Sequence, residues 1–177
     1  MIDCFATLDV NRHPWLEEEP LKQTFFRLSA VHHPDQPTGD AARFEAINAA
    51  WNTLKDPVTC LKHWLDLESP GFTAPSTPPP ELIDLFMEAG ALQQSVTAFD
   101  QEYAAATSAL SRSLLEPRRL VLITKKDALL ARLQVMDDEH LATIRGENPT
   151  IASLQQCYAY LAYLRKWKRS LGNQKLG

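Results

Sequence analysis

Five of the twelve prolines of this chain lie within the eleven residues from Pro70 to Pro80. Proline has no backbone N–H and disfavours a helical conformation in the residue before it, so a helix cannot run through this segment. We expect residues 70–80 to form an extended, semi-rigid linker. The linker separates a first domain at residues 1–69 from a second domain at residues 81–177.

On both sides of this linker the apolar residues recur with the period of a helix. Alternation typical of β-strands is absent, apart from the short and ambiguous run Leu120–Ile123. The 45% of apolar and 23% of charged residues are ordinary for a globular protein. The pattern therefore predicts an all-α fold.

In the first domain, two amphipathic stretches predict a pair of antiparallel helices. One starts near Glu17–Pro20, where acidic residues and a proline favour a helix N-terminus. The other follows Asp40, a candidate N-cap, and ends at Asp56-Pro57. Short helices are expected near residues 3–8 and 58–68. The apolar stripes that pair the two long helices are Leu21, Phe25, Leu28 and His32 on one, and Phe44, Ile47, Trp51 and Leu54 on the other.

The second domain carries long apolar seams with spacings of three, four or seven residues. The first seam runs from Leu82 to Leu110, and Glu116-Pro117 is expected to break or kink its helix. A second seam runs from Leu122 to Met136, and a last helix covers about residues 149–171. Three such helices predict an antiparallel bundle. The alternative is a coiled coil between chains, but the breaks return the chain on itself, so we expect a monomer or weak self-association.

The loop between the two long helices of the first domain contains His33, Pro34 and Asp35. A residue before proline avoids the helical conformation, so the first helix should end at His32 or His33. This places the imidazole and the carboxylate on an exposed corner, where a partner could bind. His32 lies on the apolar stripe and is interpreted as a packing residue.

The residues around this corner resemble the J-domain family. The resemblance rests on the aromatic helix with Phe25-Phe26-Arg27-Leu28, the His33-Pro34-Asp35 triplet, and the block from Arg43 to Pro57. The layout of the whole chain is similar, more narrowly, to HscB, the family of J-type co-chaperones of iron–sulfur cluster assembly. The J-domain resemblance covers about residues 1–70.

The resemblance implies a co-chaperone that binds a DnaK/HscA-type heat-shock chaperone, stimulates its ATPase and delivers a client. His33, Pro34 and Asp35 would carry the coupling, and Lys22 and Arg27 would meet an acidic surface of the chaperone. The chain departs from the family in basic charge, because residues 1–70 contain 6 Lys and Arg against 11 Asp and Glu, a net of −5. Weaker long-range attraction predicts slower docking.

In the HscB family the client is the scaffold protein that carries the nascent iron–sulfur cluster. Matched by position, its docking residues fall on five positions of the second domain. Three of them lack the large aliphatic and acidic side chains of the family. The alternative is therefore a helical assembly or interaction protein, whose J-like domain either recruits a chaperone to a different client or is degenerate. The five positions are Phe86, Gly90, Ala91, Gln94 and Tyr163.

Several other classes of protein are disfavoured. His32, His33 and Asp35 could serve as metal ligands or as a base with its orienting acid, but no second ligand cluster and no nucleophile motif accompany them. We therefore expect no enzyme, no metal and no cofactor. The cluster at residues 165–169 is the one candidate basic patch and is better explained as the end of a helix, so no nucleic acid is expected.

The location of the chain is predicted from what it lacks. No apolar run approaches the length of a membrane span, and the N-terminus resembles no secretory signal. Cys4, Cys60 and Cys157 are far apart and form no CxxC pair, which indicates reduced thiols. We expect a cytoplasmic protein.

Overall fold

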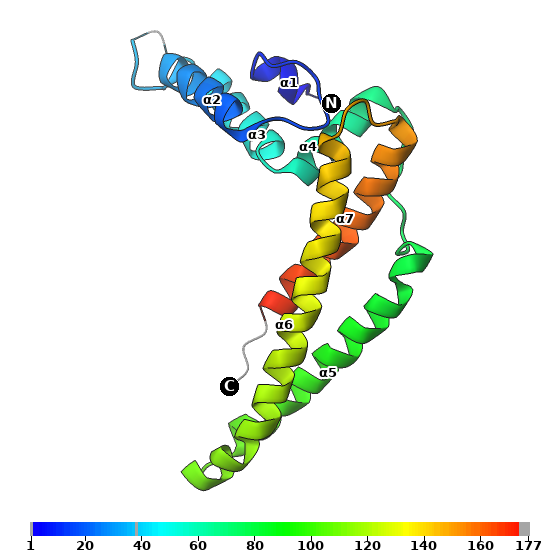
Figure 1. The fold of residues 1–177 in the computed structure, drawn as a ribbon. Helices are drawn as coiled ribbons and strands as arrows, with labels where there is room; N and C mark the ends of the chain where they lie inside the picture. The colour runs from blue at the N-terminus through cyan, green and yellow to red at the C-terminus, as the bar shows by residue number, and fades with distance from the viewer. Residues whose placement is uncertain (1, 38, 174–177) are drawn as a thin grey trace. The chain divides into compact units, whose positions relative to one another are not determined.

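The computed structural model describes residues 2–37 and 39–173 (Figure 1). Every regular element within these residues is helical, which confirms the all-α prediction. In chain order the elements are α1 (Cys4–Thr7), α2 (Glu18–His32), α3 (Ala41–Leu54), α4 (Pro57–Glu68), the short 3-10 helix η1 (Pro80–Leu82), α5 (Ile83–Ala105), α6 (Ala109–Arg145) and α7 (Ile151–Gly172).

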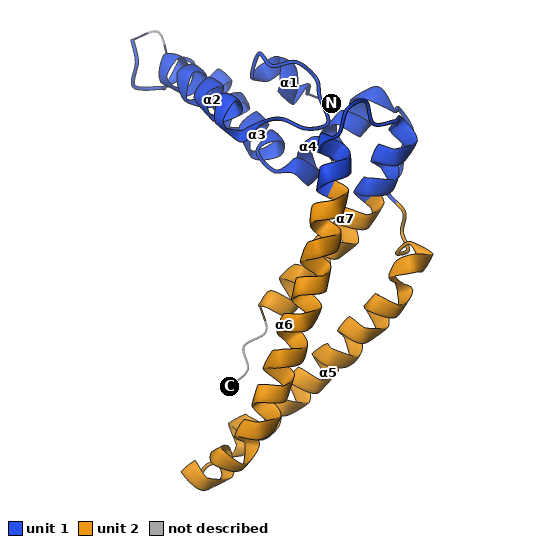
Figure 2. Cartoon of the chain, in the orientation of Figure 1, with its two compact units in different colours: residues 1–74, 141–158 blue, residues 75–140, 159–177 orange. Residues whose placement is uncertain are grey.

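The chain divides into two compact units (Figure 2). Unit 1 comprises residues 1–74 and 141–158, and unit 2 comprises residues 75–140 and 159–177. Inside unit 1, the Gln155 side chain donates a hydrogen bond of 3.0 Å to the Ser69 hydroxyl, and the rings of Phe72 and Tyr158 meet edge to face. The end of α6 and the start of α7 thus pack with the N-terminal helices. The predicted boundaries at residues 69 and 81 stay a prediction.

Three aspartates fix the starts of the helices in unit 1. Asp3, Asp40 and Asp56 each accept hydrogen bonds from backbone N–H groups in the first turn of α1, α3 and α4. These N–H groups have no partner inside the helix, so each carboxylate supplies one and also complements the positive end of the helix dipole. The predicted N-cap at Asp40 is confirmed, and Pro57 occupies the first turn of α4, where its missing N–H is harmless.

The core of unit 1 lies between α2 and α3, with α1 and α4 closing its sides. Phe25 of α2 stacks on Trp51 of α3 with ring centroids 4.8 Å apart. His32 is half-buried, as expected of a residue on the apolar stripe. The fully or nearly buried members of this core are Phe5, Leu8, Leu21, Ile47, Ala50, Leu54 and Cys60.

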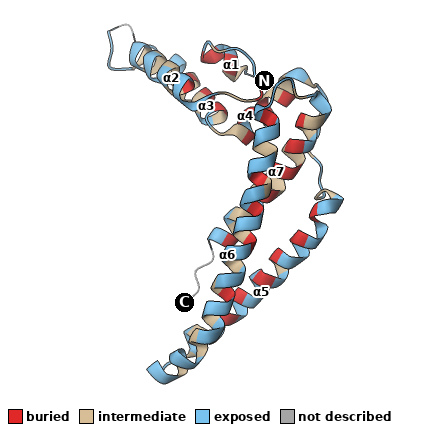
Figure 3. Ribbon diagram, in the orientation of Figure 1, coloured by how far each residue is buried: buried red, intermediate tan, exposed pale blue. Residues whose placement is uncertain are grey.

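Unit 2 is a bundle in which α5, α6 and α7 bury one seam each (Figure 3). Asp137 is almost completely buried and lies 2.9 Å from the Lys168 amine and 3.8 Å from the Arg165 guanidinium. Two cations of the basic cluster therefore neutralise a buried carboxylate of α6. The buried apolar residues include Leu85, Leu92, Val96, Phe99, Leu122, Leu129, Leu133, Leu164 and Trp167.

The predicted break at Glu116-Pro117 is wrong, because α6 continues through Pro117. The chain turns earlier, between Ala105 and Ala109. There Ser108 acts as an N-cap: its hydroxyl accepts the Ser111 N–H at 3.0 Å, and the Ser111 hydroxyl accepts the Ser108 N–H at 3.2 Å. This reciprocal cap supplies a partner for the Ser111 N–H in the first turn of α6, and so favours a helix start at this point. The packing of Leu115 and Leu122 in the core of unit 2 offsets the cost of Pro117 inside the helix. Leu110 consequently belongs to α6 and is 72% exposed, not part of the first seam.

Within the described ranges, no helix has the length and apolar character needed to cross a membrane.

Candidate functional site

The His33-Pro34-Asp35 corner follows directly from the end of α2. His32 is the last helical residue, and His33 has φ −59° and ψ 135°, outside the helical region. This is the conformation that the following proline favours, so the predicted helix end is confirmed. Pro34 and Asp35 are exposed and His33 is half-buried.

The His33 ring is held in place by two neighbours. It meets the ring of Phe44, on α3, edge to face at 5.1 Å, and its Nδ1 accepts the Asp35 N–H at 3.2 Å. Because Nδ1 accepts, the neutral ring carries its proton on Nε2, which remains available as a donor. The Asp35 carboxylate is 3.5 Å from Nδ1 and its side chain is 89% exposed. The corner thus presents a fixed imidazole and an accessible carboxylate side by side.

Gly39 closes the same loop and was missed by the sequence analysis. A Cβ at this position would lie 2.1 Å from the His33 carbonyl oxygen, far inside van der Waals contact. Three backbone hydrogen bonds, from Gln36 to His33, from Gly39 to Gln36 and from Asp40 to His32, draw the loop together. The signal in the sequence was a glycine directly before the N-cap Asp40. Only glycine permits this close approach.

The solvent-facing side of α2 is more apolar than basic. Lys22 pairs with Glu19 at 3.6 Å, and Arg27 is exposed. Beside them, Phe26 is 58% exposed and Val31 is 56% exposed. A partner that docks along α2 toward the corner therefore meets Phe26 between the two predicted cationic contacts, and Val31 between Arg27 and the triplet.

The five predicted client-binding residues lie in unit 2, four on α5 and Tyr163 on α7. Phe86 is 48% exposed, and its ring lies 5.7 Å from that of Trp167. Tyr163 is half-buried, 6.0 Å from the Trp167 ring, and donates a hydrogen bond of 3.1 Å to the Pro75 carbonyl. The buried Trp167 thus contacts both Phe86 and Tyr163.

The remaining three client-binding positions lie on two different sides of α5. Gly90 and Gln94 line the same shallow hollow, whereas Ala91 lines a groove between α5 and α6. All three side chains are small or uncharged. The five residues therefore do not form one continuous patch.

The described residues offer no convergent group of three His, Cys, Asp or Glu side chains that could hold a metal ion. Burial raises the pKa of Cys60 to about 12, and burial also raises the pKa of Cys4 and of Cys157. A thiol with a raised pKa is protonated at neutral pH and is a poor nucleophile.

The helices and the loop of unit 1 define a known domain. Residues 3–62 match the DnaJ domain, so this segment of the chain is a J-domain. Over 58 residues it is 43% identical to the chaperone protein DnaJ of Gluconacetobacter diazotrophicus and 41% identical to the protein NolC of Rhizobium fredii. The matched segment is 31% of this chain and about 15% of the length of these curated relatives. The J-domain family is non-enzymatic, in agreement with the prediction against catalysis.

The whole chain has a structural neighbour as well. The chaperone HscB from Vibrio cholerae matches with a TM-score of 0.60 and 19% sequence identity, covering 97% of this chain and 96% of that one. At this identity the match establishes the fold. The predicted combination of a J-domain and a helical bundle is thereby confirmed.

Proposed function

We propose that this protein is a co-chaperone whose unit 1 binds a DnaK-type heat-shock chaperone and stimulates its ATPase. The observation that carries the proposal is the DnaJ domain with an exposed and conformationally fixed His33-Pro34-Asp35 corner. The cytoplasm, where chaperones of this type act, is the proposed location.

The geometry supports a division of roles within the corner. The exposed Asp35 carboxylate can accept hydrogen bonds from a cationic group of the chaperone, and His33 can donate from Nε2. Pro34 restricts the backbone between them, so less conformational entropy is lost on binding. Lys22 and Arg27 would contact the chaperone along α2.

Single substitutions at the corner test this proposal. Asp35→Asn and His33→Gln remove the charge and the imidazole while keeping similar size, so the helical content and the unfolding midpoint should stay unchanged. The measurement is the rate of ATP hydrolysis by a DnaK-type chaperone with increasing amounts of each variant. We expect both variants to lose the stimulation. Asp127→Asn, an exposed aspartate in unit 2, is the matched control. Full stimulation by Asp35→Asn would contradict the proposal and favour a degenerate domain.

For unit 2 we propose that it presents a client protein, and that this client is an iron–sulfur cluster scaffold. The support is the HscB-like fold together with the exposed Phe86 ring beside Trp167 and Tyr163. Gly90, Ala91 and Gln94 would lie under the client. In this arrangement residues 1–69 recruit the chaperone and residues 81–177 hold the client.

A second candidate is a client of a different kind. It is favoured by Gly90, Ala91 and Gln94, which contribute neither a carboxylate nor a large aliphatic side chain. Calorimetric titration of an iron–sulfur scaffold protein into the full chain separates the two. Binding that weakens in Phe86→Ser, but not in the equally exposed control Ile151→Ser of α7, supports the scaffold. If titration of the scaffold into the unaltered chain releases no heat of binding, while the same chain still stimulates the ATPase, the client is of the other kind.

A further inference from the structure

Helix α6 carries a second apolar face that its own bundle leaves uncovered. Between Leu110 and Val135 every position at alternating spacings of four and three residues is exposed. The four large side chains among these positions are 53% to 74% exposed. We call this set the α6 stripe; its main members are Leu110, Leu114, Pro117, Val121, Ala128 and Val135, and Thr124 and Ala131 complete the spacing. The corresponding part of α6 is coloured mostly as exposed in Figure 3.

The α6 stripe is distinct from the seam that α6 buries in unit 2. The buried seam consists of Leu122, Leu129 and Leu133, one position beyond the stripe residues Val121 and Ala128 or two beyond Ala131. One residue corresponds to a rotation of about 100° around a helix. The two faces are therefore separate, and the α6 stripe follows the alternating spacing by which one helix packs against another over many turns. The 25 steps from Leu110 to Val135 correspond to about 37 Å of helix.

A row of cations borders the α6 stripe on the side of α5. Arg118, Lys125 and Arg132 follow one another at seven-residue intervals. Arg118 pairs with Glu102, and Arg132 pairs with Glu88 at 2.6 Å, both on α5. Both arginines nevertheless keep about half of their side chains exposed.

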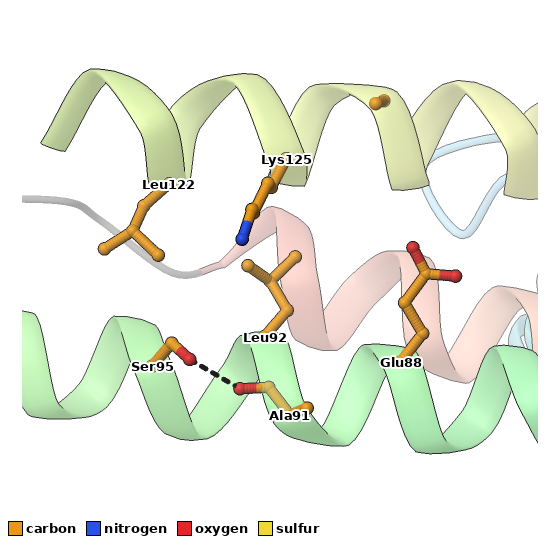
Figure 4. Close-up of a pocket in the computed structure, with 7 residues that line it drawn as sticks. Glu88, Ala91, Leu92, Ser95, Leu122 and Lys125 are labelled. Carbon is orange, nitrogen blue, oxygen red and sulfur yellow. Dashed lines mark hydrogen bonds between the residues drawn. The ribbon is translucent and has the colours of Figure 1, made fainter. Parts of the chain in front are cut away.

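Lys125, at the middle of this row, makes no ion pair within the part of the chain that the structure describes. Its side chain extends from α6 over Leu92 of α5 (Figure 4). Here a groove of about 330 Å³ opens between the two helices, lined also by Leu122 and Ala128. The α6 stripe is thus continuous with an apolar groove that carries an available cation at its edge.

The charge pattern decides which occupant fits this surface. In an antiparallel pair of two copies, the row of Arg118, Lys125 and Arg132 would face itself, and like charges at such flanking positions oppose association. A parallel pair would set this row against Ser113, Leu120, Asp127 and Gln134, which include one acid. A second copy of the chain is therefore a poor partner.

We propose that the α6 stripe and its cationic row bind an amphipathic helix of another protein that carries an apolar seam and acidic residues along one flank. Apolar stripes of this extent on an exposed helix mark interaction sites. The acidic flank would lie over Lys125 and the two arginines, while apolar side chains cover Leu114 and Val121. The α6 stripe and the cationic row include none of the residues assigned to the chaperone or to the client. One predicted client-binding residue, Ala91, also lines the groove beside Lys125.

A pair of designed peptides tests the proposal. Both have 28 residues and leucine or valine at the seam positions; one has glutamate and the other lysine at the flank positions. Fluorescence anisotropy of the labelled peptides with the full chain gives the dissociation constants. We expect the glutamate peptide to bind at least tenfold more tightly than the lysine peptide. Val121→Ser should weaken the glutamate peptide about tenfold, because apolar contact is lost. Val31→Ser, on α2 and of similar exposure, should leave binding unchanged.

The charge contribution is tested with Lys125→Glu, which should reverse the preference between the two peptides. Equal binding of both peptides, or binding that Val121→Ser leaves unchanged, would overturn the proposal. So would a concentration-dependent doubling of mass in sedimentation that Val121→Ser abolishes, because a second copy would then cover the α6 stripe.

Discussion

The two helix hairpins of this protein differ in what they expose to solvent. The α2–α3 hairpin of unit 1 exposes a loop, and the α5–α6 hairpin of unit 2 exposes an apolar helix face. The first buries its apolar stripes and presents a small loop, in which hydrogen bonds, Phe44 and Gly39 fix His33 and Asp35. The second is joined by a short capped turn at Ser108 and leaves an apolar face along α6 open. The first hairpin is suited to a small contact surface, on which binding depends on the exact positions of a few groups. The second is suited to a long contact surface, on which binding depends on buried apolar area and on charge.

The largest effect is expected where the first hairpin depends on a single backbone contact. Gly39→Ala places a methyl group against the His33 carbonyl, so the loop must move and the corner with it. We expect a loss of stability on the order of 2 kcal/mol and loss of ATPase stimulation. Urea unfolding and the ATPase assay measure the two effects.

Gly90→Ala in the second hairpin is the control for this substitution. A Cβ there has no neighbour within 4 Å, and the residue lies inside α5. Alanine is the better helix former by about 0.5–1 kcal/mol, so the control should stabilise the protein. If both substitutions leave stability and stimulation intact, the loop of the first hairpin is not held as tightly as the structure indicates.

A smaller loss of stability, with ATPase stimulation retained, is expected when the buried carboxylate of unit 2 loses one of its cationic partners. Lys168→Ala removes the cation 2.9 Å from Asp137, which then keeps Arg165 at 3.8 Å. Because a buried charge loses part of its compensation, unfolding should become easier by about 1–3 kcal/mol. Lys166→Ala, exposed on the same helix, should have little effect in the same urea titration. Unchanged stability of Lys168→Ala would mean that Arg165 suffices for Asp137.

The third prediction concerns pH and unit 1. His63 is buried on α4, and its Nε2 accepts the Cys4 N–H at 3.0 Å. Burial lowers the pKa of His63 below 6.5, so the unfolded chain takes up a proton at a higher pH than the folded protein does. Stability from this group is complete above about pH 6.5 and declines as the pH falls below that value.

His63→Gln keeps a hydrogen-bond acceptor without titrating. Urea unfolding at several pH values should show a shallower decline between pH 7 and 5 for this variant than for the unaltered protein. His140→Gln, in unit 2, should retain the decline. The interpretation fails if His63→Gln follows the same curve as the unaltered protein.

The smallest effect is expected on the rate of chaperone association. Phe26→Lys and Val31→Lys together would add two positive charges to the exposed side of α2. Long-range attraction should then raise the association rate severalfold at low salt, with little difference at high salt. Stopped-flow measurements across ionic strength test this, with Val121→Lys on α6 as the control. An equal gain from the control would show that net charge, and not its place on α2, governs the rate.

Local rules predicted much of unit 1. Asp40, the predicted N-cap, precedes α3 because a short acceptor side chain supplies a partner for a free N–H group, whatever the rest of the fold does. The same rule accounts for Asp56 before α4, a cap that was not predicted. His33 ends α2 because Pro34 follows it. The corner could therefore be located by reading neighbouring residues, and the aromatic spacing that pairs α2 with α3 extended the prediction to the hairpin.

In unit 2 the same local rules failed where the local effect of a proline competed with the packing of the helix around it. Pro117 was expected to end a helix, yet it lies on the exposed face of α6, where the packing of Leu115 and Leu122 on either side holds the helix together. Leu110 was assigned to a buried seam, but it is exposed. The spacing of apolar residues identifies an apolar face of a helix, but it does not show whether another helix packs against that face.

The sequence by itself determined the helical class, most of the helix ends and the chemistry of the corner, because those depend on residues close together in the chain. The tertiary structure decided which of the two apolar faces of α6 is buried, that Trp167 joins Phe86 to Tyr163, and that position 39 must be glycine. Each of these depends on a neighbour distant along the helix bundle or across a loop, and the spacing of residues within one helix carries no information about such neighbours.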